Sequence, residues 1–192
     1  MKNLKNIKKL LINVDMVNGF VREGAMADKY IEHIIPEHIK LMEAVKGEDE
    51  IIAIIKDTHK ADCREFKRYP VHCVEGTTEA ELVDELKKFE ENALVYEKNA
   101  TSTIYAENFL TNIDEMINLQ EVIIIGCCTD ICVLNLAIPL QNYFDQKDRD
   151  ILITIPKNAV ETYDAPNHNR EKYNKIAFEL MEQAGINLVE TL

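Results

Sequence analysis

The order of hydrophobic and polar positions predicts strands that alternate with helices. Short apolar runs, rich in β-branched residues, lie at residues 10–14, 51–55, 93–96, 122–125, 151–155 and 186–189. They are almost continuously apolar, which is typical of strands covered on both faces. Segments with helical spacing lie between them, at about residues 31–46, 78–89, 103–118, 131–145 and 168–184. In the second of these, Thr78 and Glu81 have the spacing of a capping box. We therefore expect a three-layer, doubly wound α/β fold, with a mostly parallel six-stranded sheet and helices on both faces.

Composition and charge narrow the class of protein. No repeat or Gly/Pro-rich linker divides the chain, so we interpret residues 1–192 as one domain. The net charge of −12 at pH 7 argues against a nucleic-acid partner or an anionic membrane surface. The longest uncharged stretch, residues 131–144, is too short for a membrane span, and the run at 10–14 is too short for a signal-peptide core. We expect a soluble cytoplasmic protein with five reduced cysteines, and a homo-oligomer remains open.

Chemically active residues follow four of the predicted strands. Asp15 follows the first, Asp57 the second and Lys98 the third, and Cys132 comes shortly after the fourth. Because ligands of parallel sheets bind at the carboxyl ends of the strands, these side chains should share one edge. A thiol beside a carboxylate and an ammonium has a proton acceptor and a counter-charge. The pattern predicts Cys132 as a nucleophile, with Asp15 and Lys98 as its partners.

Cys132 would lie in the first turn of the following helix. Thr129 or Asp130 would cap that helix, and its N-terminus would lower the pKa of the thiol. The alternative is a buried, unreactive cysteine. Likewise, Asp15 could simply cap a turn and Lys98 could be an ordinary surface lysine.

The segment after the second strand carries residue types that bind metals. Four of them fall within sixteen positions: Asp57, His59, Glu65 and His72. Mixed oxygen and nitrogen donors suit Zn(II), Mn(II) or Fe(II). Asp62 competes with Glu65 as a ligand, and Cys63 and Cys73 could contribute sulfur. The alternative is a polar surface loop with two unrelated histidines.

Four blocks together resemble a known family. They are residues 10–20 (LLINVDMVNGF), 57–77 (DTH…EFKRYPVHCVEGT), 94–102 (LVYEKNATS) and 124–133 (IIGCCTDICV). In this order they resemble the signature blocks of the nicotinamidase branch of the isochorismatase-like cysteine hydrolases. The resemblance implies the isochorismatase-like hydrolase fold and a catalytic triad of Asp15, Lys98 and Cys132.

The resemblance also implies a ligand set, a substrate pocket and an oxyanion hole. One divalent metal, zinc in the first place with manganese or iron as alternatives, would be held by Asp57, His59, Glu65 and His72. Phe20 and Tyr69 would enclose a pyridine ring. The backbone N–H groups of Cys128 and Cys132 would form the oxyanion hole, and a cis peptide would join Cys127 to Cys128.

The activity implied by the resemblance is hydrolysis of nicotinamide, and of pyrazinamide, to the acid and ammonia through a thioester, a reaction of NAD salvage. One alternative is a related cysteine hydrolase acting on another small amide, an N-carbamoyl compound or a ureido compound. Another is an inactive binding module for a similar ring. Two positions depart from the family pattern: Gly19 stands where an Asp is usual, and Ile104 where an aromatic residue is favoured.

Overall fold

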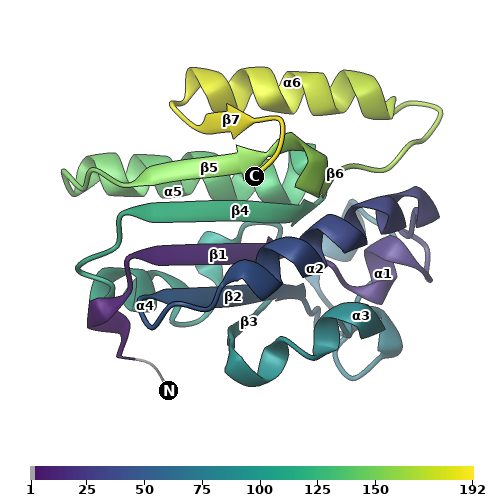
Figure 1. Cartoon of the computed structure of the whole chain (residues 1–192). Coiled ribbons are helices and arrows are strands. Elements are labelled where there is room, and N and C mark those ends of the chain that lie inside the picture. Colours follow the sequence, from purple (N-terminus) through teal and green to yellow (C-terminus); the bar gives the residue numbers. More distant parts are fainter. Residues whose placement is uncertain (1–2) are drawn as a thin grey trace.

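The computed structural model describes residues 3–192 and contains one parallel sheet (Figure 1). Its strands are β1 (Lys9–Val14), β2 (Glu50–Asp57), β3 (Leu94–Lys98), β4 (Glu121–Cys127), β5 (Leu152–Pro156), β6 (Val160–Glu161) and β7 (Asn187–Val189). The order across the sheet is β3-β2-β1-β4-β5-β7, and β6 pairs with the end of β4. The six predicted strands are thus confirmed. The seventh, β6, has only two residues, which is too few for a periodic pattern.

Within residues 3–192, six α-helices cover the two faces of the sheet. They are α1 (Asn18–Val21), α2 (Ile35–Ala44), α3 (Asp84–Lys87), α4 (Phe109–Glu115), α5 (Leu134–Gln146) and α6 (Arg170–Gln183). Side chains of α1, α2 and α3 pack in one core cluster, and those of α4, α5 and α6 pack in the other. Figure 1 shows α2 crossing in front of the strands and α5 behind them. The predicted three-layer α/β architecture is therefore confirmed.

The helix predicted at residues 78–89 is replaced by short turns. Thr78–Ala80 is a single 3-10 turn, α3 has only four residues, and Glu81 ends the first turn, so the predicted capping box is wrong. The reason lies in the backbone hydrogen bonds. Asn18 N donates to Glu81 O, and Val83 N donates to Met16 O. Backbone groups that a helix would use internally are therefore bonded to the segment that follows β1.

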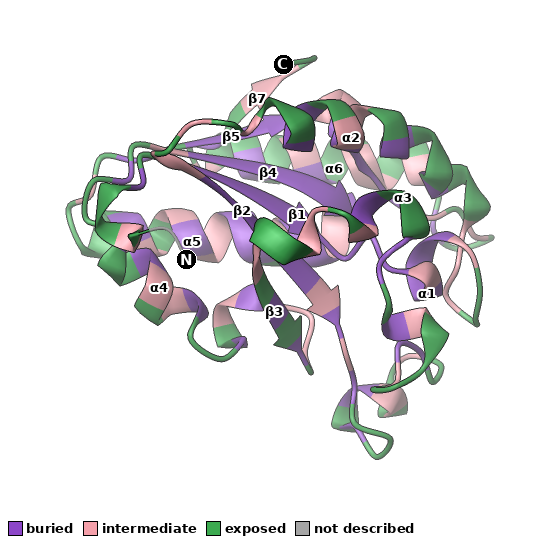
Figure 2. Cartoon of the chain, turned by 60° about the horizontal axis from the view of Figure 1, so that its bottom comes forward, coloured by how far each residue is buried: buried purple, intermediate pink, exposed green. Residues whose placement is uncertain are grey.

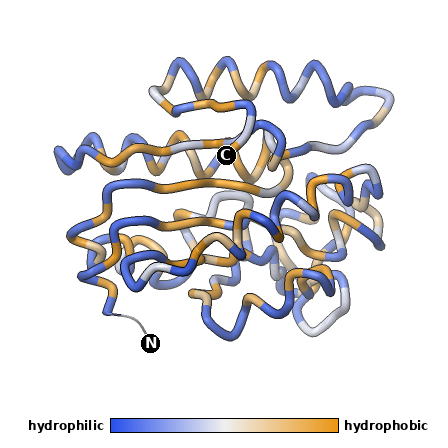
Figure 3. The backbone as a smooth tube through the Cα atoms, viewed as in Figure 1, coloured by the Kyte–Doolittle hydropathy of each residue, from blue (hydrophilic) through white to orange (hydrophobic). Residues whose placement is uncertain are grey.

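The apolar strands explain where the core lies. Every residue of β1 from Leu10 to Val14 is buried, and so are all those of β4 after Glu121. Figure 2 shows the central strands as continuous buried ribbons between helices, and Figure 3 shows the same strands as hydrophobic tracts. Alternate side chains of β1 belong to the core clusters on opposite faces of the sheet. Leu10 and Ile12 pack in the cluster with α4, α5 and α6, and Leu11 packs in the cluster with α1, α2 and α3. The lack of polar alternation thus follows from burial on both faces.

The register aligns the carboxyl ends of the central strands. Val14 pairs with Ile55 on one side and Gly126 on the other, and Asp57 pairs with Lys98. Gly126 has a φ of +131°, and a Cβ atom there would lie 2.1 Å from Val14 O. A side chain at that position is excluded by this contact, so glycine allows β4 to approach β1 where both strands end. Among residues 3–192, no helix is both long enough and apolar enough to cross a bilayer.

Candidate active site

Lys98 lies at the centre of the side chains that follow the strands. Its Nζ atom is 2.9 Å from Asp15 Oδ2, 2.7 Å from Asp57 Oδ1 and 3.7 Å from Cys132 Sγ. All four side chains are buried. The structure therefore brings together the three residues predicted as a triad, and it adds Asp57 as a second carboxylate partner of the lysine.

Burial and charge set the protonation of Asp15 and Lys98. Burial raises the pKa of Asp15 to about 6; the Lys98 ammonium lowers it, and the negative charge of Asp57 raises it. Burial alone would lower the pKa of Lys98, but attraction to Asp15 and Asp57 raises it well above its ordinary value. At neutral pH, Lys98 is a cation and Asp15 is mainly a carboxylate. Since the pKa of Asp15 is close to neutral pH, this carboxylate can accept a proton and return it.

Cys132 lies in a π-helical turn, Thr129–Val133, between β4 and α5. The residue that begins this turn is Cys128, and no side chain caps it, so the predicted cap by Thr129 or Asp130 is wrong. Burial raises the pKa of the Cys132 thiol well above its ordinary value, although Lys98 lowers it. The expected lowering by the helix N-terminus is therefore overcome by burial. The direction of this shift favours the neutral thiol over the thiolate.

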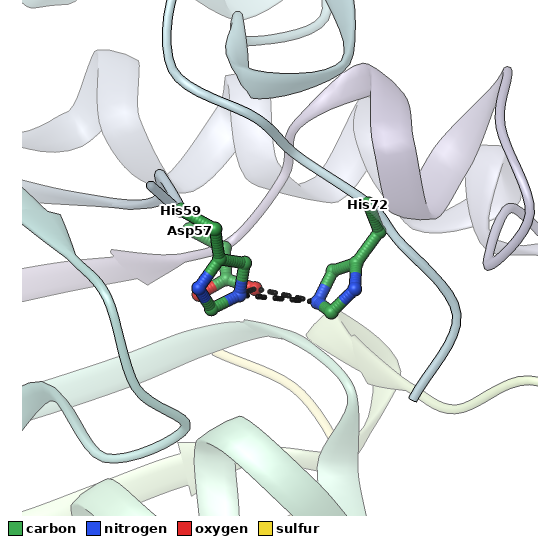
Figure 4. Close-up of side chains that lie close together, drawn as sticks. All are labelled: Asp57, His59 and His72. Carbon is green, nitrogen blue, oxygen red and sulfur yellow. Dashed lines mark hydrogen bonds and ion pairs between the residues drawn. The ribbon is translucent and has the colours of Figure 1, made fainter. Parts of the chain in front are cut away.

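The predicted metal ligands converge next to this group. Asp57 Oδ2 is 3.0 Å from His59 Nε2 and 3.2 Å from His72 Nε2, and the two Nε2 atoms are 3.1 Å apart. Glu65 Oε2 is 3.6 Å from His59 Nε2. Figure 4 shows Asp57 and His59 side by side, with His72 pointing toward them from the opposite segment. Asp57, His59 and His72 form a group of donor atoms close enough to share one cation.

The hydrogen bonds of the imidazole rings fit a cation between them. His72 Nδ1 lies 2.7 Å from Pro70 O, and His59 Nδ1 lies 3.3 Å from Asn99 Oδ1. Because both oxygens are acceptors, each Nδ1 carries the hydrogen in a neutral ring, and each Nε2 presents a lone pair. Burial would raise the pKa of Asp57, but the positive charge of Lys98 is the main influence that lowers it overall. Two lone pairs and an ionised carboxylate thus face one point, so these residues fit a divalent metal.

The competing ligands are placed differently. Asp62 is exposed, whereas Glu65 is buried. Cys63 Sγ lies 3.4 Å from Nδ1 of His59, on the side of the ring away from His72, although Cys63 also belongs to a second donor group with His59 and Glu65. Cys73 is buried against Gly19. Glu65 is therefore favoured over Asp62 as the additional oxygen donor.

A pocket opens onto both sets of residues. It is lined by Phe20, Met26, Asp57, Glu65, Tyr69, His72, Thr101, Cys128, Ile131 and Cys132. The ring centroids of Phe20 and Tyr69 lie 5.6 and 6.4 Å from that of His72. Both predicted aromatic residues therefore line the cavity beside a predicted metal ligand. The peptide between Cys127 and Cys128 is cis, as expected, while the oxyanion hole formed by Cys128 and Cys132 stays a prediction.

Several residues of the site were missed from the sequence. The Thr101 hydroxyl donates to Glu65 Oε1 at 2.6 Å, and Asn99 Oδ1 accepts from Lys60 N at 3.0 Å. Asn99 and Thr101 follow β3 directly, so the rule that singled out Lys98 could have found them. Met26 lines the cavity from the loop after α1, and no sequence signal marked it.

His168 supports the turn that carries Cys132. Its ring is stacked between Tyr163 and Tyr173, at 3.9 Å from each centroid. His168 Nε2 is 2.8 Å from Asp130 Oδ2, and the Thr162 hydroxyl donates to Asp130 Oδ1 at 2.5 Å. Asp130 therefore holds the turn of Cys132 against the segment before α6, through a contact with His168, which lies 38 positions further along the chain. No local pattern in the sequence could reveal it.

Comparisons with known proteins identify the family of this chain. The isochorismatase domain model matches residues 9–191. A curated relative, nicotinamidase 1 of Arabidopsis thaliana, is 27% identical over 175 residues, covering 82% of this chain and 71% of the relative. The crystal structure of a nicotinamidase from Bacillus subtilis is 26% identical, with a TM-score of 0.77, over 96% of this chain and all of that one.

Two further solved structures have the same fold. A pyrazinamidase of Pyrococcus horikoshii in complex with zinc is 25% identical, with a TM-score of 0.75, over 95% of this chain and 99% of that one. An N-carbamoylsarcosine amidase of Thermoplasma acidophilum is 24% identical, with a TM-score of 0.76, over 95% of each chain. With a family match that spans nearly all of its length and a fold shared with solved members, the chain belongs to the isochorismatase family, in its nicotinamidase-like branch.

Proposed function

We propose that this protein is a cysteine amidohydrolase that converts nicotinamide, and pyrazinamide, to the corresponding acid and ammonia. The observation that carries the proposal is the position of Lys98 Nζ, within reach of Asp15, Asp57 and Cys132 beneath one cavity. Similarity to nicotinamidases at 26–27% identity supports the substrate class. Aromatic side chains at positions 20 and 69 suit a flat heteroaromatic ring.

The reaction follows from the proton positions. Asp15 accepts the Cys132 proton, and the sulfur attacks the amide carbon while Lys98 balances the negative charge. Backbone N–H groups of Cys128 and Cys132 would hold the resulting oxyanion. Asp15 then returns the proton to the leaving nitrogen, the C–N bond breaks, and ammonia departs from a thioester. Water, deprotonated by Asp15, attacks the thioester and releases the carboxylic acid and the thiol.

A divalent metal held by Asp57, His59, Glu65 and His72 would supply a Lewis acid that binds the ring nitrogen of the substrate. Zinc is the first candidate, with manganese and iron as alternatives. The lone pairs of the two Nε2 atoms and the ionised Asp57 support this assignment, and so does the zinc complex of the P. horikoshii pyrazinamidase. These residues would hold the metal next to the pocket, so their main role would be to orient the substrate.

A second candidate is hydrolysis of an N-carbamoyl or ureido amide, as in the fold neighbour from T. acidophilum. Substrates such as N-carbamoylsarcosine carry a carboxylate. The cavity lining within the described residues includes Asp57 and Glu65 but neither lysine nor arginine, and Lys98 already has two carboxylate partners. This lining offers no cationic side chain that could bind a carboxylate, so it favours the neutral amide nicotinamide over an anionic substrate.

The direct test is ammonia release from nicotinamide by zinc-loaded protein, with and without a chelator. Cys132→Ala should abolish release while zinc content, measured by mass spectrometry, stays that of the unsubstituted protein. Cys132→Ser, which conserves shape, should also be inactive because a hydroxyl is a far weaker nucleophile than a thiolate. Ammonia release by Cys132→Ala near the original rate would refute the nucleophile. Release from an N-carbamoyl amino acid but not from nicotinamide would favour the second candidate.

A further inference from the structure

Gly19 stands where the family block usually has an aspartate, and Cys73 and Glu79 occupy the space beside it. A Cβ atom on Gly19 would lie 2.5 Å from Cys73 Sγ and 3.2 Å from Glu79 Cβ. Contacts below 3.0 Å with a packed sulfur require something to move, and Cys73 is completely buried. An aspartate at position 19, the usual residue of the family block, would therefore require the Cys73 side chain or the turn that carries Glu79 to shift.

Glu79 brings a carboxylate into this region from a different segment. Its Oε2 atom accepts a hydrogen bond from the backbone N–H of Cys73 at 2.9 Å. The same carboxylate lies against the loop after α1, because a Cβ atom on Gly24 would be 2.5 Å from Glu79 Oε1. Both glycines thus leave room for the Glu79 side chain, which reaches from the 3-10 turn Thr78–Ala80 to the loop that carries His72.

The hydrogen bond to Cys73 bears directly on the two histidines. The backbone N–H that donates to Glu79 belongs to the peptide bond between His72 and Cys73. Backbone hydrogen bonds then link Cys73 to His59. The His59 N–H donates to Cys73 O, and the Glu75 N–H donates to His59 O, both at 2.8 Å. Cys73 also has a φ of +45°, a conformation that a residue with a side chain adopts only when its surroundings hold it.

We propose that Glu79 is a positioning residue for the metal-binding loop, and that it supplies from position 79 the carboxylate that the family block carries at position 19. This inference rests on the metal site of the proposed function. Glu79 acts through the Cys73 peptide and so sets the direction in which His72 points toward His59 and Asp57. Partners that orient metal ligands typically change metal affinity about 10- to 100-fold when they are removed.

The test is zinc affinity, measured by competition with a chromogenic chelator. Glu79→Ala should weaken zinc binding at least about tenfold. Glu79→Gln should lose less, because an amide oxygen still accepts the Cys73 N–H, although without charge assistance. Glu75→Ala is the matched control, since it removes an exposed acid of the same loop and should change affinity less than twofold. Equal affinities for Glu79→Ala and Glu75→Ala would overturn the proposal.

A rescue separates positioning from a general loss of stability. In the variant Cys73→Ala/Glu79→Ala, adding Gly19→Asp should recover zinc affinity, because the sulfur that blocks position 19 has been removed. In the unsubstituted protein, Gly19→Asp should instead lower the melting temperature. If the triple variant binds zinc no more tightly than the double variant, the idea that Glu79 takes the place of an aspartate at position 19 is contradicted. If Glu79→Ala does not fold, Glu79→Leu, which keeps a similar volume but has no acceptor, takes its place, and zinc affinity equal to that of Glu75→Ala would then overturn the inference.

Amide exchange keeps this test distinct from the proposed function. In metal-free protein, NMR should show the Cys73 N–H protected, and Glu79→Ala should raise its exchange rate at least about tenfold while Glu75→Ala leaves it unchanged. If the original protein binds no zinc but shows this difference, the metal assignment fails and the loop contact stands. If zinc binds and the Cys73 N–H exchanges equally in all variants, the positioning role fails alone.

Discussion

Replacement of Lys98 by methionine tests the electrostatics of the whole site. Methionine retains much of the volume of lysine but removes the ammonium that lies 2.9 Å from Asp15 and 2.7 Å from Asp57. Coulomb's law with an effective dielectric constant of about 20 gives about 6 kcal/mol for one such contact. That energy corresponds to about a 10⁴-fold change in proton affinity. The pKa of Asp15, about 6 with the lysine present, would then rise above neutral pH.

Two results follow for Lys98→Met. Ammonia release should be abolished at pH 7, because Asp15 would be protonated and could not accept the proton of Cys132. The free energy of unfolding at pH 7 should fall by about 3–5 kcal/mol, since removing one partner leaves buried charges uncompensated. The sign of the pH dependence is fixed. Carboxyl groups whose pKa is raised on folding destabilise the protein as pH rises, so the deficit should shrink between pH 7 and pH 5.

Urea unfolding at several pH values and an ammonia assay measure both effects. Lys88→Met is the matched control because Lys88 pairs with Glu43 at the surface, where an ion pair contributes little to stability. A Lys98→Met variant with the same stability deficit at pH 5 and pH 7 would show that the ammonium does not compensate the carboxylates. Activity near the original rate would refute its role in catalysis.

Three further outcomes are expected. The kcat/KM of the unsubstituted protein should fall about tenfold per pH unit below pH 6, because Asp15 must be ionised; a flat acid limb down to pH 4 would contradict this. Gly126→Ala should lower the free energy of unfolding, measured by urea denaturation, by at least about 1–3 kcal/mol, since its Cβ would meet Val14 O at 2.1 Å; an unchanged free energy of unfolding would refute the close approach. His168→Ala should lower kcat up to about 10²-fold, because Asp130 loses a partner, while zinc affinity stays unchanged. Steady-state kinetics and chelator competition measure the two quantities, and an unchanged kcat would contradict the prediction.

Predictions from the sequence succeeded where chemistry follows directly from strand position. Asp15, Asp57 and Lys98 each lie at or just beyond the end of a strand, and parallel pairing brings those ends together. The apolar runs fix the strands, because their burial on both faces leaves few other arrangements. Alignment of these residues at one edge therefore needed no knowledge of the loops.

The failures concern segments that are held by distant partners. The predicted helix at residues 78–89 is replaced by short turns, because its backbone bonds to residues 16–18. The cap predicted for the turn of Cys132 is wrong, because Asp130 bonds to His168 and Thr162 instead. In both cases the local pattern was correct for an isolated helix, and tertiary hydrogen bonds overrode it.

The two groups of residues that the sequence presented separately are joined through Asp57. One of its carboxylate oxygens, Oδ1, contacts Lys98 at 2.7 Å, while the other, Oδ2, faces His59 and His72 at 3.0 and 3.2 Å. Lys98 in turn contacts Asp15 and Cys132. A change of charge at Asp57, His59 or His72 therefore alters the electric field at Cys132 through a chain of direct contacts. Because the surroundings are buried, this field is only weakly screened by solvent, and the proposed metal site and the proposed triad must be treated as one electrostatic unit.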